Sequence, residues 1–217
     1  MGAKKMQDVR VMSLSDRRSY VEQALLRANA IAVELPDGDK LYAAFERMLQ
    51  FVVASEFLYA AGCHDTSAVL YMQLRQAGLQ EADMALCIGE VNALGSRFDH
   101  SWVEVRGQVF DVAICAPSKS GGFAGGPVFA GEDLTINALA QAKFGVESKD
   151  RLDHDAATVY GMDLSQYLVF QQSNKSKSMV DLAREVYHID GQELLAKYGN
   201  VNRVWRNPLL NPQELAV

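Results

Sequence analysis

Three side chains that suit a thiol-based reaction occur along the chain in the order Cys63, His100 and Asp111. A cysteine attacks a carbonyl carbon as its thiolate, so it needs a nearby base to take the thiol proton. An imidazole is the usual base, and a carboxylate often orients the imidazole. The three residues therefore predict nucleophilic catalysis on a carbonyl compound, with an amide as the expected substrate.

The stretch Gly62-Cys63-His64-Asp65-Thr66-Ser67-Ala68 predicts that Cys63 starts a helix. An apolar face follows, and Gly78 suits the helix end; the face consists of Val69, Leu70, Met72 and Leu74. Unpaired N–H groups and the helix dipole lower the pKa of a thiol at this position and stabilise an oxyanion. A structural cysteine that happens to start a helix is the alternative interpretation.

Residues 101–105 and 109–113 predict two strands, with His100 at the start of the first and Asp111 on the second. If Arg106-Gly107 forms a two-residue turn, the two side chains share a face as diagonal neighbours, about 7–8 Å apart. A turn of odd length places them on opposite faces. Arginine is not an ideal first residue for a type I′ turn, so the sequence leaves the register open.

Other acidic residues and a metal site are alternatives at this region. Asp99 and Glu104 are further candidate partners for the histidine of the first strand. A metal site at Cys63-His64-Asp65 is disfavoured, because adjacent helical residues do not converge on one ion and the chain has no CxxC or HxxxH pair. His64 and Asp65 are instead expected to shape the start of the helix, where the dipole favours the carboxylate.

The remaining cysteines and histidines have simpler interpretations. Cys87 lies in an apolar strand and is expected in the core, as is Trp102. Cys115 is expected to be structural, with a role near the site as the alternative. His154 is flanked by carboxylates and is expected to be solvated, and His188 lies near a helix end.

The composition excludes several classes of protein. The 217 residues are 49% hydrophobic and 22% charged, which suits a chain that buries a core. A net charge of -6 disfavours nucleic acid as a partner. Three cysteines do not form a disulfide framework and suit a reducing compartment. No membrane span or signal peptide is evident, so a cytoplasmic location is expected, with signal-independent export left open.

The pattern of elements predicts an α+β fold in a single domain over residues 1–217. Residues 62–114 form the expected core, and residues 130–200 a helical elaboration. Helices are predicted at 16–33, 39–60, 133–144, 163–172, 178–188 and 191–198, a strand at 85–91 and a loop at 92–97. The Gly- and Ser-rich loop 117–127 lacks the GxxxxGK[ST] pattern of a phosphate-binding loop.

Over residues 62–114 the chain resembles the transglutaminase-like, papain-related cysteine enzymes. The matching residues are Gly62-Cys63-His64-Asp65, Gln76-Ala77-Gly78-Leu79, Gly89, His100-Ser101-Trp102-Val103-Glu104-Val105 and Asp111. The resemblance implies a catalytic helix packed on a small antiparallel sheet, with Cys63 as nucleophile, His100 as base and Asp111 as orienting residue.

The family includes transglutaminases, peptidases, amidases and deglycosylating enzymes. The resemblance therefore implies a thioester intermediate and a protein, peptide or small amide substrate, with no metal or organic cofactor. Asp-Pro-Thr often follows the strand in this family, whereas here the run is Asp111-Val112-Ala113, and the spacing from His100 to Asp111 is short. Some members have lost catalysis, so a non-catalytic binding or scaffold protein is the rival function.

Overall fold

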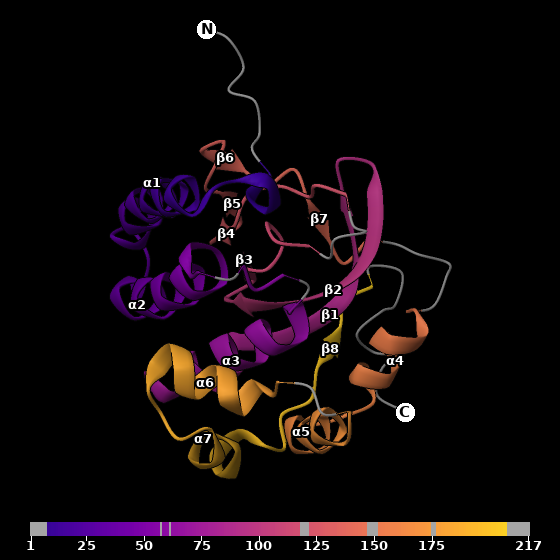
Figure 1. The fold of residues 1–217 in the computed structure, drawn as a ribbon. Helices are drawn as coiled ribbons and strands as arrows, with labels where there is room; N and C mark the ends of the chain where they lie inside the picture. The colour runs from indigo at the N-terminus through magenta and orange to yellow at the C-terminus, as the bar shows by residue number, and fades with distance from the viewer. Residues whose placement is uncertain are drawn as a thin grey trace, which may run out of the picture.

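The computed structural model describes residues 8–56, 58–60, 62–117, 122–146, 152–174 and 177–207. These residues form an α+β fold in which helices pack on a small mixed sheet. In Figure 1, α1 and α2 lie together on the left, α3 crosses the middle, α5, α6 and α7 lie below α3, and α4 lies to its right. Among the described residues, no helix has both the length and the apolar composition that crossing a bilayer requires.

The first two helices are α1, Leu14–Ala32, and α2, Gly38–Leu49, which continues as a π-helical stretch, Gln50–Ala54. The second helix was predicted to reach residue 60, but it ends at Ala54. Arg17 of α1 is buried and donates to the carbonyl oxygens of Val53, at 2.9 Å, and Glu56, at 3.2 Å. The arginine thus satisfies carbonyl groups at the end of the helix, and the chain turns away there.

Helix α3, Cys63–Gln76, begins at the predicted residue. Gly78 follows its end with φ +97°, a backbone conformation that glycine adopts without a steric penalty. One face of α3 packs against β1, Met84–Ala93, and β2, Ser96–Val105, and another against α6. The helix is thus held between the sheet and the C-terminal helices, with Cys63 at its first turn.

Strands β1 and β2 form a long antiparallel hairpin, paired from Met84↔Val105 to Ala93↔Ser96. The predicted loop at 92–97 is wrong, because pairing continues up to a tight turn at Leu94-Gly95, where both φ values are positive. A second tight turn at Arg106-Gly107 joins β2 to β3, Gln108–Phe110. The pairing Val103↔Phe110 shows that this turn has two residues.

The main sheet has the order β3-β2-β1-β7, and β8 also pairs with β1. β7, Lys143–Phe144, is antiparallel to β1, whereas β8, Val204–Trp205, is parallel to it. A Cβ atom at Gly89 of β1 would lie 2.7 Å from the carbonyl oxygen of Arg206. Glycine therefore allows the C-terminal segment to approach the sheet closely.

The helix predicted at 133–144 is wrong. This region contains β5, Glu132–Asp133, and β6, Ala138–Leu139, which form a small sheet with β4, Val128–Phe129, and it ends in β7. Buried Asp133 accepts hydrogen bonds from the backbone N–H groups of Gly126 and Thr135. These bonds stabilise turns that compete with a helix.

The later helices are α4, His154–Tyr160; α5, Leu164–Ser173; α6, Met179–Tyr187; and α7, Gly191–Tyr198. The last three agree with predicted segments, whereas α4 was not predicted. The predicted helical elaboration over 130–200 is therefore helical only in its later part. The side chain of Asp153 caps α4 by accepting a hydrogen bond from the N–H of Ala156.

Two clusters of buried side chains lie on the two faces of the hairpin. The larger includes residues of α3, among them Leu70 and Met72, together with Val103 of β2. The smaller contains Cys87, Trp102 and Ile114. Neighbouring residues of β2 point to opposite faces, so the strand contributes to both clusters.

Candidate active site

Cys63 is the first residue of α3, and its side chain is partly exposed. The carbonyl oxygen of Gly62 accepts the N–H of Thr66 at 2.9 Å, which closes the first helical turn. A Cβ atom at Gly62 would lie 2.1 Å from the ring of Tyr59, so glycine leaves room for that ring. The N–H groups of the first turn have no helical carbonyl partner, and their dipoles favour an anion beside the Cys63 sulfur.

His100 and Asp111 form a buried pair. The His100 Nε2 atom lies 2.6 Å from the Asp111 Oδ2 atom, and the two residues are 4% and 3% exposed. The two-residue turn at Arg106-Gly107 sets the register that places Asp111 diagonally across from His100, on the same face of the sheet. The structure thus has the register that brings these two predicted residues together.

Asp111 is held by backbone hydrogen bonds on both sides. Its Oδ1 atom accepts the N–H groups of Ala113, at 2.8 Å, and Ile114, at 3.3 Å. Its own N–H and carbonyl pair with Val128 at 2.8 Å. The carboxylate therefore has one oxygen fixed by the backbone and the other free to accept from His100.

The two alternative carboxylate partners are engaged elsewhere. Asp99 accepts a hydrogen bond from the N–H of Asp153 at 2.6 Å. Glu104 accepts from Trp102 Nε1 at 3.1 Å and from Arg206 Nη2 at 2.6 Å. Asp111 is thus the carboxylate that contacts His100.

The rings of both His100 and His64 act on the Cys63 thiol at close range. Burial raises the pKa of this thiol, but the charges and hydrogen bonds of the two histidines outweigh burial and bring the pKa well below its usual value. For His100, burial lowers the pKa, while the charges of Asp111 and Cys63 raise it to about 10. These opposite shifts favour a thiolate–imidazolium pair.

The ring of His64 is also tied to β2. Its Nδ1 atom lies 2.7 Å from the Oγ atom of Ser101, which is fully buried. The backbone carbonyl of His64 accepts a hydrogen bond from the buried guanidinium of Arg203 at 3.2 Å. The expectation that His64 only shapes the helix start therefore omits its contact with the strand and its effect on the thiol.

Asp65 joins the start of α3 to α5. Its carboxylate accepts hydrogen bonds from Tyr59, at 2.9 Å, Tyr167, at 2.6 Å, and Gln171, at 2.5 Å. Burial raises its pKa, although the two tyrosine hydrogen bonds act in the opposite direction. The guanidinium of Arg203 stacks on the Tyr167 ring, 4.6 Å from its centroid.

Sequence analysis missed Tyr167, Gln171 and Arg203. Tyr167 and Gln171 lie more than 100 positions from Asp65 along the chain. Such contacts have no local motif, because the folded arrangement of α3, α5 and β8 brings these residues together. The only signal in the sequence is a set of polar side chains on otherwise apolar helices.

A cleft of about 600 Å³ opens beside Cys63 and His100. Its walls come from the β1–β2 hairpin, the segment after β3, and the start of α4. Small apolar residues line part of it. The polar and aromatic residues that line it are Arg97, Phe98, Asp99, Asp153 and Asp155. The cleft gives a substrate access to the sulfur and to the imidazole.

Cys87, Cys115, His154 and His188 do not line this cleft. Cys87 and Cys115 are buried, and burial is the main cause that raises the pKa of each thiol. His154 is exposed at the first position of α4. His188 is exposed at the C-cap of α6, where its φ is +55°.

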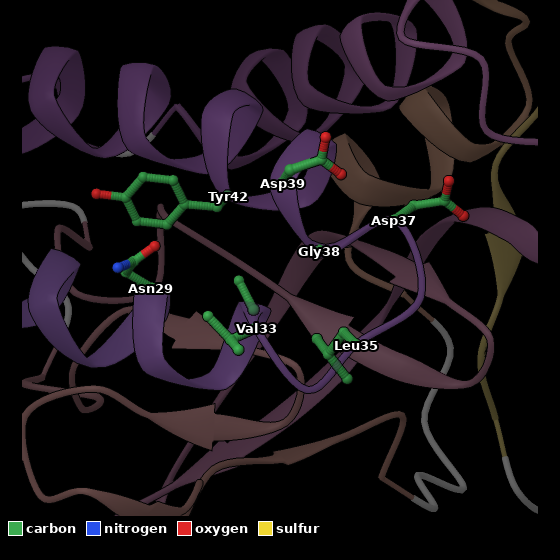
Figure 2. A pocket seen from close by; sticks show the side chains of 8 residues that line it. Asn29, Val33, Leu35, Asp37, Gly38, Asp39 and Tyr42 are labelled. Atoms are coloured by element: carbon green, nitrogen blue, oxygen red, sulfur yellow. The ribbon is translucent and has the colours of Figure 1, made fainter.

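A second hollow, of about 450 Å³, lies between α1 and α2 at the turn that joins them (Figure 2). Asn29 of α1 and Val33, directly after its end, lie across from Tyr42 of α2, and Asp37 and Asp39 lie at the turn. None of its lining residues is a cysteine or histidine, so it lacks the groups on which thiol chemistry depends.

Comparisons with protein families, with curated proteins and with solved structures find no match to this chain. Within the described part of the chain, no three Cys, His, Asp or Glu side chains are grouped so that they could hold a metal ion.

Proposed function

We propose that the protein is a cysteine enzyme that cleaves or transfers an amide bond through a thioester on Cys63. The observation that carries the proposal is the imidazole of His100, which lines the same cleft as Cys63, acts on its thiol and contacts buried Asp111 at 2.6 Å. The order of the three residues resembles that of transglutaminase-like cysteine enzymes, which supports the same roles.

In the proposed acylation step, the Cys63 thiolate attacks the carbonyl carbon of the substrate. The carbonyl oxygen becomes an oxyanion, and the N–H groups at the start of α3 stabilise it. His100 donates its proton to the leaving nitrogen, the C–N bond breaks, and a free amine departs. The products of this step are a thioester on Cys63 and a neutral imidazole.

In the second step, the neutral imidazole of His100 takes a proton from the acceptor as the acceptor attacks the thioester. The C–S bond breaks, and Cys63 leaves as a thiolate beside the imidazolium. Water as the acceptor gives a carboxylic acid, and an amine gives a new amide. Asp111 keeps the ring oriented and stabilises its charge in both steps.

The experiment that tests the proposal traps the thioester. The protein is incubated with a panel of peptide carboxamides, isopeptides and small acylated amines, and its mass is measured after a rapid acid quench. The proposal predicts an acyl adduct on Cys63 for at least one class, and release of that adduct by water or an added amine. The variant Cys63→Ala is the control and forms no adduct.

A non-catalytic binding or scaffold protein with the same fold gives a different result. Such a protein binds members of the panel without a covalent adduct, and Cys63→Ala leaves that binding unchanged. This outcome overturns the proposed function.

A further inference from the structure

The Cys63 thiol has two imidazole neighbours, and the second, His64, belongs to no step of the mechanism above. His64 follows the cysteine in the first turn of α3, and its Nδ1 atom lies 2.7 Å from Ser101 Oγ. Because one ring nitrogen is engaged by this buried hydroxyl, Nε2 is the nitrogen available to the sulfur. The hydroxyl holds the ring at the start of α3, next to the nucleophile in the chain.

The two imidazoles are anchored on opposite faces of β2. His100 and Ser101 are neighbours in this strand, and side chains of neighbouring residues point to opposite faces. His100 lies on the face of Phe98 and Phe144, as its ring contacts show. His64 is tied to the other face through Ser101.

We propose that His64 is a second catalytic imidazole, which hydrogen-bonds the Cys63 thiolate from the face of β2 opposite to His100. This inference rests on the proposed role of Cys63 as nucleophile and adds to it. A second donor disperses the negative charge of the sulfur and keeps the thiolate populated before a substrate arrives.

The anchors of the two rings imply different tasks. Asp111 is an anionic anchor and favours the protonated form of His100, which supplies the proton for the leaving amine. Ser101 is a neutral anchor, and with its hydroxyl donating to Nδ1, the Nε2–H group of His64 donates to the sulfur. His100 thus transfers protons, whereas His64 stabilises the thiolate.

Other charged or titratable groups act on the sulfur or on His64 from each neighbouring element. Asp65 of α3 interacts with both Cys63 and His64, and Asp99 of β2 interacts with His64. The remaining groups act on Cys63 and are His100 of β2, Tyr167 of α5 and Arg203 before β8. The variants below leave all of these groups in place.

Two substitutions separate the contacts of the ring. In His64→Asn, the short amide occupies the position of Nδ1, so it keeps a partner for Ser101 and loses the donor at the sulfur. In His64→Gln, the longer amide occupies the position of Nε2 and restores an uncharged donor at the sulfur. The matched control is His188→Asn, because His188 is an exposed histidine in a left-handed conformation that asparagine tolerates.

The test measures the rate of iodoacetamide alkylation of Cys63 from about pH 5 to about pH 10, read by peptide mass spectrometry. We expect His64→Asn to slow alkylation at about pH 6 by about tenfold or more, which corresponds to a thiol pKa that rises to about one unit above the pH of the assay. At about pH 10 the rates converge to within about twofold, because the thiol is ionised in every variant. His64→Gln recovers part of the loss, and His188→Asn behaves as the wild type.

Two results overturn the role of His64. The first is a pH profile of His64→Asn that matches the wild type. The second is a rate lowered equally at every pH, which indicates a structural role. If Cys63 of the wild type is itself no more reactive than Cys87 and Cys115, the proposed function fails instead, so the two failures are distinguishable.

Discussion

Cys63 and Cys115 are two thiols influenced by the same carboxylate in opposite ways. Asp111 contacts His100, whose charge acts on the Cys63 thiol, so the carboxylate acts on this thiol through an imidazole. Cys115 follows Asp111 by four positions and donates to the carbonyl oxygen of Val112 at 3.4 Å, within the same backbone turn. Burial, followed by the charge of Asp111, raises the pKa of Cys115, whereas the pKa of Cys63 is lowered.

The difference shows that proximity to a charged site does not make a thiol reactive. Both cysteines lie close to a buried aspartate, but only the one at the start of α3 has imidazole groups and unpaired helical N–H groups around it. The two thiols also differ in access, because Cys63 lines the cleft and Cys115 does not. Position in the fold, rather than residue type, separates the candidate nucleophile from the structural thiol.

The largest effect is expected when the imidazole link is broken at Asp111. In Asp111→Asn, the amide oxygen stays with the N–H groups of Ala113 and Ile114, so the amide NH2 faces His100 Nε2. This arrangement favours the tautomer with its proton on the nitrogen that faces Cys63. We expect turnover to fall by on the order of a thousandfold, and a fall of at least tenfold is the minimum that the account requires. Kinetics on a substrate from the acyl-trapping panel measure this loss, with circular dichroism as the check on folding.

Unchanged turnover in Asp111→Asn removes this carboxylate from the mechanism and leaves a Cys63–His100 dyad.

Substitutions of Asp65 test whether its hydrogen bonds stabilise the fold around Cys63. Asp65→Ala removes the carboxylate that accepts hydrogen bonds from three side chains: Tyr59, Tyr167 and Gln171. We expect a loss of about 3 kcal/mol in the free energy of unfolding, measured by urea denaturation. Asp65→Asn keeps an acceptor oxygen and is expected to cost about 1 kcal/mol. Equal losses for the two variants contradict the hydrogen-bond account.

The pH dependence of turnover follows from the opposite shifts of the reacting pair. On the acidic side, activity rises as the thiol of Cys63 ionises, well below the ordinary pKa of a cysteine. On the alkaline side, activity falls as His100 loses its proton at about pH 10, because the leaving amine then lacks its acid. Beyond that pH we expect about a tenfold loss per unit. An alkaline limb near the ordinary histidine pKa indicates that Asp111 does not stabilise the imidazolium.

The smallest effect is expected at the structural thiol. Cys115→Ala removes a buried sulfur and leaves a small void, at an expected cost of about 1–2 kcal/mol in the free energy of unfolding. Alkylation of Cys63 in this variant should match the wild type at each pH. A changed rate at Cys63 contradicts the division between the two thiols and revives a role for Cys115 near the site.

The sequence predicts the parts of the site whose geometry is local. The start of α3 at Cys63 follows from its apolar face and from Gly62. For the turn at Arg106-Gly107, the sequence allows two strand registers, and the structure has the one with a two-residue turn. The strands of residues 128–144 were missed, because the apolar spacing of this segment resembles that of a helix. The hydrogen bonds of buried Asp133 form turns there instead.

The contacts between distant segments also escaped prediction. The approach of the C-terminal segment to Gly89, and of Tyr167 to Asp65, joins residues more than 100 positions apart. Only the packed arrangement of helices and sheet brings such residues together. The neighbouring pair Cys63-His64 was visible in the sequence, but its contact with Ser101 depends on how α3 meets β2.

The most direct test of the central claim compares all three thiols in one sample. The folded wild-type protein is treated with a limiting amount of iodoacetamide at about pH 6.5, and the alkylated fraction of Cys63, Cys87 and Cys115 is measured by peptide mass spectrometry. We predict that Cys63 is labelled at least about a hundredfold faster than either buried thiol, because it alone is both ionised and accessible. Labelling of Cys63 at a rate equal to or below that of Cys87 and Cys115 contradicts its assignment as the nucleophile.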